Sequence, residues 1–128
     1  VRCAAAIGAS TKIVAVETEG TPTLHAALAA GRPVDVAISG LAADALGASR
    51  IGTPNFEIAQ RLVPRSVLVS DDAVRAAQRT LWDDLRVIAE PAGATGLAAL
   101  LSGAYVPADG ERVATLVCGA NTDLATFL

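Results

Sequence analysis

The residues best placed to do chemistry lie near the end of the chain, between positions 113 and 123. An apolar, largely β-branched run at 113–117 stops at Cys118, and a turn of small residues and then polar residues follow it. This pattern predicts a buried strand whose carboxyl end opens into a site. Ligands of α/β proteins bind at that edge of the sheet, which makes Cys118 a candidate ligand contact. For a cysteine taken alone, the alternative is a small buried hydrophobic residue.

Three further positions are candidates for a functional role. Glu90 stands next to Pro91, where a helix must break or restart. Its carboxylate is therefore either buried and aimed into a site or a charge that favours the start of the next helix. Gly40 follows Ser39 in what is, by sequence alone, an ordinary turn. His25 is the only histidine and has no identifiable Ser or Cys partner, so we expect it to be structural.

Strands and helices alternate along the chain, and they must position these residues. Strands are predicted at 13–16, 66–69 and 113–117, with a further extended stretch at 34–38. Helices are predicted to follow Thr21-Pro22 and Thr53-Pro54, where Thr caps the helix and Pro takes its first position, and to cover 93–101. The stretch 41–51 is expected to be irregular or a short helix.

The longest predicted helix starts at Ser70, with Asp71 and Asp72 at the positive end of its dipole. Its core face is expected to comprise Val74, Ala77, Leu81, Leu85 and Ile88.

This alternation predicts an α/β fold of three layers, with a mostly parallel sheet and helices on both faces. Three or four strands are few for such a sheet, because parallel strands need neighbours at their edges. Hydrophobic residues make up 52% of the chain, which fits a half-sheet whose partner strands lie elsewhere.

Composition excludes several classes of protein. The net charge of −3, the lack of a basic cluster and an aromatic content of 3% argue against nucleic-acid binding. No apolar run approaches the roughly 20 residues of a membrane span. Cys3 and Cys118 form neither a metal-type spacing nor a disulfide framework, so a cytoplasmic location is the default. The chain has no Met and starts in Ala-rich sequence, so we expect it to be a piece of something longer or a processed product.

Five segments, taken in order, resemble the serine/threonine dehydratases, which are pyridoxal-phosphate enzymes of the tryptophan-synthase-β-like fold (fold type II). The segments are 13–17, 21–28, 39–42, 87–94 and 117–121. The resemblance implies that residues 1–128 form the carboxyl-terminal portion of the large, cofactor-binding domain. It also implies that the catalytic lysine and the phosphate-binding glycine loop lie upstream and are absent from this chain.

The resemblance assigns cofactor contacts to Cys118, Gly119, Gly40 and Glu90. Cys118 matches a Ser or Cys that hydrogen-bonds the pyridine nitrogen of pyridoxal phosphate. A neutral, weak hydrogen-bonding group does not require that nitrogen to be protonated, which gives a weaker electron sink than an aspartate would and suits β-elimination. Gly40 matches a loop glycine beside the cofactor, although the family often has Asp where Ser39 stands. Glu90 matches the acidic residue of a Glu-Pro segment close to the ring.

The resemblance gives two further residues no catalytic role. Glu17 matches a divalent-cation ligand of some relatives, including serine racemases, but the second acid of that site is replaced here by Thr23, a poor ligand for a hard cation. We therefore predict no metal site and favour a strand-end carboxylate in a hydrogen-bond network. Lys12, the only lysine, does not match the Schiff-base lysine. No catalytic residue is assigned in this chain, and the chain alone is expected to be inactive.

The function implied is part of an L-threonine or L-serine dehydratase, an ammonia-lyase that yields a 2-oxo acid and ammonia. The expected partners are the amino-acid substrate, the missing amino-terminal half of the enzyme and a second copy in a homodimer, with no nucleic acid and no membrane. Serine racemase is a rival that the residue at position 23 disfavours, and a cysteine-synthase relative is disfavoured by the Cys-Gly-Ala turn. A non-catalytic α/β binding or interaction module and a complete flavodoxin-like domain remain open.

Overall fold

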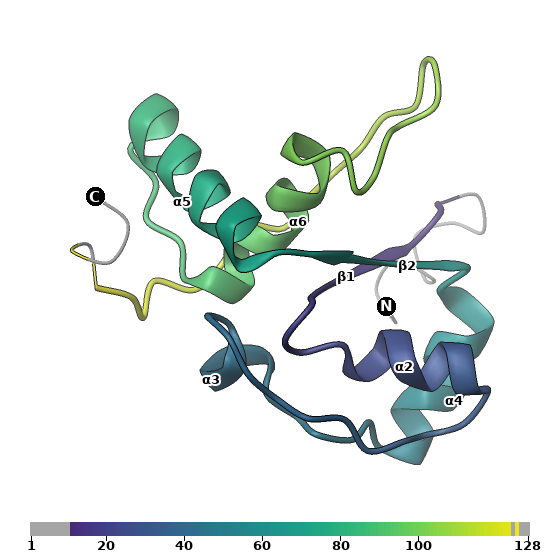
Figure 1. Cartoon of the computed structure of the whole chain (residues 1–128). Helices are drawn as coiled ribbons and strands as arrows, with labels where there is room; N and C mark the ends of the chain where they lie inside the picture. The colour runs from purple at the N-terminus through teal and green to yellow at the C-terminus, as the bar shows by residue number, and fades with distance from the viewer. Residues whose placement is uncertain (1–10, 124, 126–128) are drawn as a thin grey trace.

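The computed structural model describes residues 11–123 and 125 and has two strands between two pairs of helices (Figure 1). The elements, in order, are β1 (Val14–Thr18), α2 (Thr23–Ala30), α3 (Ala43–Leu46), α4 (Thr53–Leu62), β2 (Arg65–Val69), α5 (Asp71–Leu85) and α6 (Pro91–Leu101). The strands pair in parallel, from Val14 opposite Arg65 to Thr18 opposite Val69. Helices α5 and α6 lie on one side of the strands, and α2 and α4 lie on the other. The predicted α/β class with a parallel sheet is confirmed.

The core lies between the strands and the α5–α6 pair, which is the most extensive helix contact of the fold. Buried side chains there include Val67, Val69, Val74, Ala77, Leu81, Ala94, Ala98 and Tyr105. Most α6 residues on this face are Ala, so the helix packs close to its neighbours.

Helix α5 begins as its sequence predicts and ends earlier. The Ser70 hydroxyl accepts a hydrogen bond from the Ala73 amide at 3.2 Å, which is the expected cap. Arg86 adopts a left-handed conformation, with φ of 55°, and ends the helix. Leu85, the last residue of the helix, is 66% exposed, and Ile88 is 37% exposed and outside the helix, so the prediction that both belong to the core face is wrong.

Helix α2 starts without the predicted threonine cap. Its N-cap is Pro22, which makes no side-chain cap bond. The Thr21 hydroxyl instead lies 2.8 Å from the Thr18 hydroxyl, and both residues are buried in the turn after β1. The acceptors for the first turn come from the end of β1, where the Glu17 carboxylate binds the amides of Leu24 and His25.

Two predicted extended stretches are not strands in the described part of the chain. Residues 113–117 belong to no sheet, and Leu116 is 79% exposed. Residues 34–38 form a loop in which the Val36 amide donates to the Ser49 carbonyl at 2.9 Å. A strand exists only with a hydrogen-bonded neighbour. The edge of β1 away from β2 has no paired strand among residues 11–123, so the described sheet has two strands, and the prediction of three or four is wrong for it.

Candidate functional site

The carboxyl ends of both strands are tied together by their turns. The Glu19 amide donates to the Val69 carbonyl at 3.0 Å, which joins the end of β1 to the end of β2. The Ser39 amide donates to the Gly20 carbonyl at 2.9 Å and brings a third segment to the same edge. This is the edge of a parallel sheet at which α/β proteins bind ligands.

Three of the four predicted cofactor contacts meet at the start of α6. Glu90 is the N-cap of α6, and its amide donates to the Gly119 carbonyl at 2.8 Å. Gly119 has a φ of 69°, and a Cβ there would collide with the Glu90 carboxyl group. Cys118 lies between this contact and the extended segment before it. We call Glu90, Cys118 and Gly119 the α6 junction.

Two helical glycines let the chain approach α6 this closely, and sequence reasoning did not single them out. A Cβ at Gly93 would collide with the Cys118 carbonyl, and one at Gly96 would collide with the Thr115 hydroxyl. Both glycines therefore face the segment that carries Cys118. Their spacing of three residues inside a helical pattern was the available signal, because glycine in a helix interior is destabilising unless something packs against it.

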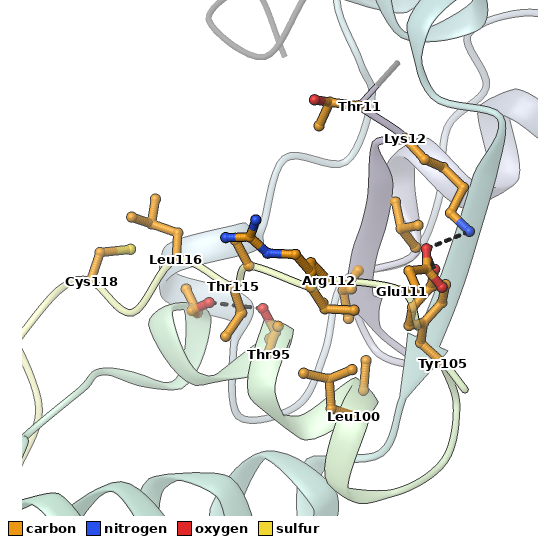
Figure 2. Close-up of a pocket in the computed structure, with 17 residues that line it drawn as sticks. Thr11, Lys12, Thr95, Leu100, Tyr105, Glu111, Arg112, Thr115, Leu116 and Cys118 are labelled. Carbon is orange, nitrogen blue, oxygen red and sulfur yellow. Dashed lines mark hydrogen bonds and ion pairs between the residues drawn. The ribbon is translucent and has the colours of Figure 1, made fainter. Parts of the chain in front are cut away.

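The Cys118 thiol is free and exposed. It lies at one end of an open cavity of about 630 Å³ that residues of β1, α6 and 111–118 line. Figure 2 shows Cys118 and Lys12 at opposite ends of this group of side chains. The sulfur is thus not held among aliphatic side chains in a closed core, and it can reach a ligand at the α6 junction.

Gly40, the fourth predicted contact, lies outside the α6 junction and next to the start of α5. Its φ is 85°, and the Leu41 amide beside it donates to Asp71 Oδ2 at 2.8 Å. Helix α3, which follows this loop, contacts α6, and Figure 1 shows α3 near the start of α6. The loop and the junction therefore lie toward the same edge of the sheet.

An ion pair lines the other end of the cavity. Lys12 Nζ lies 2.7 Å from Glu111 Oε1, and the Tyr105 hydroxyl donates to the same oxygen at 2.7 Å (Figure 2). The Lys12 ammonium, then the Tyr105 hydroxyl and the Ala108 amide, lower the pKa of Glu111 from 4.5 to about 2. The same hydrogen bond to Glu111 raises the pKa of Lys12. Lys12 precedes β1, at the amino end of the strand, so its position fits an ion pair and not a Schiff base at the carboxyl edge.

Glu17 behaves as the favoured interpretation predicts. Its two carboxylate oxygens accept the amides of Leu24 and His25 at 2.8 and 2.7 Å, so it lies in a hydrogen-bond network at the start of α2. The Thr23 hydroxyl donates to the Ala48 carbonyl. Among residues 11–123 and 125, no group of three or more His, Cys, Asp or Glu side chains could hold a metal ion.

His25 has a partner that its sequence context did not reveal. Its Nδ1 lies 3.2 Å from the Ser66 hydroxyl, 41 positions away in the chain. Ser66 is the second residue of β2, toward the amino end of that strand. The pair therefore links α2 to the sheet away from the α6 junction, in keeping with a structural role.

The residues at the carboxyl edge fit one part of a pyridoxal phosphate molecule. Gly40 is exposed and has no side chain to obstruct a flat ring, and the exposed Cys118 thiol is a neutral donor and weak acceptor suited to a ring nitrogen. Residues that contact only the ring do not need to bind the phosphate group, so no anion-binding groups are required at this edge. The Schiff-base lysine has no counterpart at this edge, because Lys12 is the only lysine of the chain. No described helix is long and apolar enough to cross a bilayer.

Comparison with known proteins identifies the family. Residues 2–119 match the family described as "Pyridoxal-phosphate dependent enzyme". The phenylserine dehydratase of Ralstonia pickettii is 42% identical over 116 residues, which are 91% of this chain and 36% of that enzyme. The biosynthetic L-threonine dehydratase of Escherichia coli K12 is 39% identical over 115 residues, which are 88% of this chain and 22% of that enzyme. The chain thus spans about a fifth to a third of the length of these curated relatives.

Solved structures agree with the sequence comparison. A threonine deaminase from T.th. superposes with a TM-score of 0.82 at 31% identity, over 93% of this chain and 43% of that one. Maize serine racemase gives a TM-score of 0.79 at 31% identity, over 94% of this chain and 38% of that one. With 2–119 matched and these folds shared, the chain belongs to the pyridoxal-phosphate-dependent enzymes of fold type II.

Proposed function

We propose that this chain is the carboxyl-terminal portion of the cofactor-binding domain of an L-threonine/L-serine dehydratase that gives a 2-oxo acid and ammonia. The observation that carries the proposal is the exposed Cys118 thiol at the α6 junction, on the carboxyl edge of a parallel sheet. The similarity to a phenylserine dehydratase and to threonine dehydratases supports the same reaction class.

Each residue of the proposed site has a physical role. Bound pyridoxal phosphate supplies an electron sink for the carbanion that forms when the α-proton of the substrate is removed. Cys118 offers the ring nitrogen a weak, neutral hydrogen bond and so does not hold a proton there. Gly119, at a φ of 69°, turns the chain directly after the thiol, and Glu90 fixes that turn through its amide. Gly40 offers bare backbone to the face of the ring.

The remaining part of the enzyme is proposed to complete the sheet beside β1. The edge of β1 away from β2 has no neighbouring strand among the described residues. Residues 113–117, which are extended, apolar and partly exposed, lie on the other side of the cavity from β1. Unpaired strand edges of this kind bind another strand. The missing amino-terminal half would supply that strand together with the Schiff-base lysine and the phosphate loop. A cytoplasmic homodimer with an amino-acid substrate is the assembly that we propose.

Serine racemization is the second candidate. The similarity to maize serine racemase, at 31% identity, favours it as an alternative within the same family. The two reactions share removal of the α-proton and differ in whether the β-hydroxyl leaves. The products therefore distinguish them, since a racemase forms D-serine and a dehydratase forms a 2-oxo acid.

The test joins this chain to the part of the Ralstonia pickettii enzyme that it does not match. We expect the fusion to acquire the yellow absorbance of lysine-bound pyridoxal phosphate and to release a 2-oxo acid from L-threonine, L-serine or phenylserine. A fusion whose lysine is replaced by Ala is the control. Hydrogen exchange should slow at the amides of 113–117 in the fusion relative to the isolated chain.

Three outcomes would change the proposal. D-serine in place of a 2-oxo acid would favour the racemase. A folded fusion that neither binds cofactor nor forms product would favour a non-catalytic module. Unchanged exchange at 113–117 in an active fusion would overturn the proposed completion of the sheet while leaving the reaction in place.

A further inference from the structure

We propose that Asp71 is a positioning residue that holds the 39–41 loop at the carboxyl edge of the sheet, so that the Gly40 backbone can lie against the cofactor ring. The proposal rests on the proposed function, because it assumes that a ring binds at this edge. This proposal gives a positioning role to the Asp71 carboxylate, whose place in the sequence indicates only the start of a helix.

The hydrogen bonds fix the loop on both sides of Gly40. Asp71 Oδ2 accepts the amide of Leu41 at 2.8 Å, and the carbonyl of Gly20 accepts the amide of Ser39 at 2.9 Å. The first bond ties the loop to α5, and the second ties it to the turn after β1. A hydrogen bond to an ionised carboxylate is stronger than one between neutral groups. The link to Asp71 is therefore expected to be the stronger of the two.

The Asp71 carboxylate also occupies the space behind Gly40. At a φ of 85° Gly40 is in a conformation that other residues avoid. A Cβ there would lie 2.7 Å from Asp71 Oδ2 and 3.1 Å from Oδ1. One side of this glycine is thus filled by the carboxylate, while the residue as a whole is exposed. A ring can approach only from the open side, and Asp71 provides the support on the other.

The usual reasons for an acidic residue at this position do not account for the contact of Asp71 with the 39–41 loop. The cap of α5 is Ser70, whose hydroxyl accepts the Ala73 amide. Asp72 is the other acidic residue of the first turn and is exposed. Both Asp71 and Asp72 interact favourably with the helix dipole. Of the two, Asp71 is half-buried and bonded to the 39–41 loop, so replacing each in turn separates the loop contact from the helix charge.

The first experiment follows the Leu41 amide in the isolated chain by hydrogen exchange. Asp71→Ala should speed its exchange by about tenfold or more, because the charged acceptor is lost. Asp71→Asn keeps an oxygen acceptor and should give a smaller increase. Asp72→Ala removes the same charge from the same helix and should leave the Leu41 amide unchanged. Equal exchange in Asp71→Ala and Asp72→Ala would overturn the assignment of the loop to Asp71.

The second experiment measures pyridoxal phosphate affinity in the fusion with the Ralstonia pickettii enzyme. Asp71→Ala should raise the cofactor Kd by about tenfold or more and alter the spectrum of the bound cofactor, because Gly40 is no longer held. Asp72→Ala should stay within about twofold. Ser70→Ala should lower the urea midpoint through loss of the cap, yet leave the cofactor Kd unchanged. That control separates positioning from a general loss of stability.

The outcomes distinguish this inference from the proposed function. If the parent fusion binds no cofactor, the proposed function fails and the cofactor role of Asp71 fails with it. If the parent fusion binds cofactor and Asp71→Ala binds it equally well, the inference alone is overturned. If Asp71→Ala does not fold, Asp71→Asn is compared with Asp72→Asn: it weakens the bond to the Leu41 amide and should still raise the cofactor Kd above that of Asp72→Asn, and equal Kd values in these two variants would overturn the inference.

Discussion

At the scale of single residues, the candidate site depends on glycines, which lack a Cβ, as much as on residues that carry side chains. A Cβ at Gly93 or Gly96 would collide with the segment that carries Cys118, and a Cβ at Gly119, on that segment, would collide with Glu90. The glycines let the backbone after position 114 lie directly on α6. The reach of the Cys118 thiol is therefore set by main-chain packing, which gives it a defined position even though it is exposed.

Substitution of Cys118 tests the proposed electronic role. Cys118→Ser keeps a neutral hydrogen-bonding group, so the fusion should keep its dehydratase kcat/KM within about tenfold. Cys118→Asp places a carboxylate beside the ring nitrogen, which would favour the protonated nitrogen. The dehydratase kcat/KM should then fall by at least about tenfold, because a differential interaction of one pKa unit corresponds to a factor of ten. Steady-state formation of 2-oxo acid measures both. Equal rates for the Ser and Asp variants would contradict the role.

Sequence reasoning brought together the residues of the α6 junction but did not find the carboxylate that contacts the 39–41 loop. Cys118, Gly119 and Glu90 fall in short segments whose order carries the resemblance, so they could be named together. Asp71 acts on Leu41, 30 positions earlier. A contact over that distance leaves no local pattern in one sequence, and at the start of α5 its side chain is indistinguishable from a dipole charge.

At the scale of elements, periodicity predicted which segments are helices, while neighbouring elements decided where they begin and end. Core periodicity persists in the sequence as far as Ile88, but the left-handed Arg86 ends α5 after Leu85. The Thr21-Pro22 pair correctly predicted that a helix starts there, but the prediction that Thr21 caps this helix was wrong. The acceptors come from Glu17, on β1, because the turn brings that carboxylate to the helix amides.

Glu17→Gln should destabilise the start of α2. The charged carboxylate accepts two amides at once, and the amide side chain has only one acceptor oxygen, so the free energy of unfolding should fall by about 1–2 kcal/mol. Urea unfolding of the isolated chain measures this change. Glu19→Gln, which removes an equal charge from an exposed position two residues later, should change it by less than about 0.5 kcal/mol. Similar losses in both variants would show that net charge, and not the cap, is responsible.

At the scale of the whole molecule, the described residues contain a two-stranded sheet, which we propose is one side of a larger sheet. The strand predicted at 113–117 has the composition of a strand but no neighbour among residues 11–123, so its pairing could not be judged from its own sequence. The cavity between that segment and β1 has the Lys12–Glu111 ion pair at one end and Cys118 at the other. The ion pair therefore helps to set how the extended segment sits relative to β1.

The stability that this ion pair contributes should depend on pH in a specific direction. The folded-state pKa of Glu111 is lowered to about 2 from an ordinary 4.5. A lowered carboxyl pKa stabilises the fold fully above the unfolded value, and this stabilisation is lost as the pH falls through the folded value. Lys12 has a raised pKa, so its contribution is lost only as the pH rises beyond 10.5. The pair is therefore expected to stabilise the chain between these limits.

Comparison of the parent chain with Glu111→Gln isolates this effect. The difference in their unfolding free energies should be constant from neutral pH down to about 4.5 and should shrink as the pH approaches 2. Because Lys12 is the largest cause of the lowered pKa, Lys12→Met should flatten this pH dependence more than Tyr105→Phe does. A difference that stays constant down to pH 2 would show that the ion pair does not hold the extended segment against the amino end of β1 in solution.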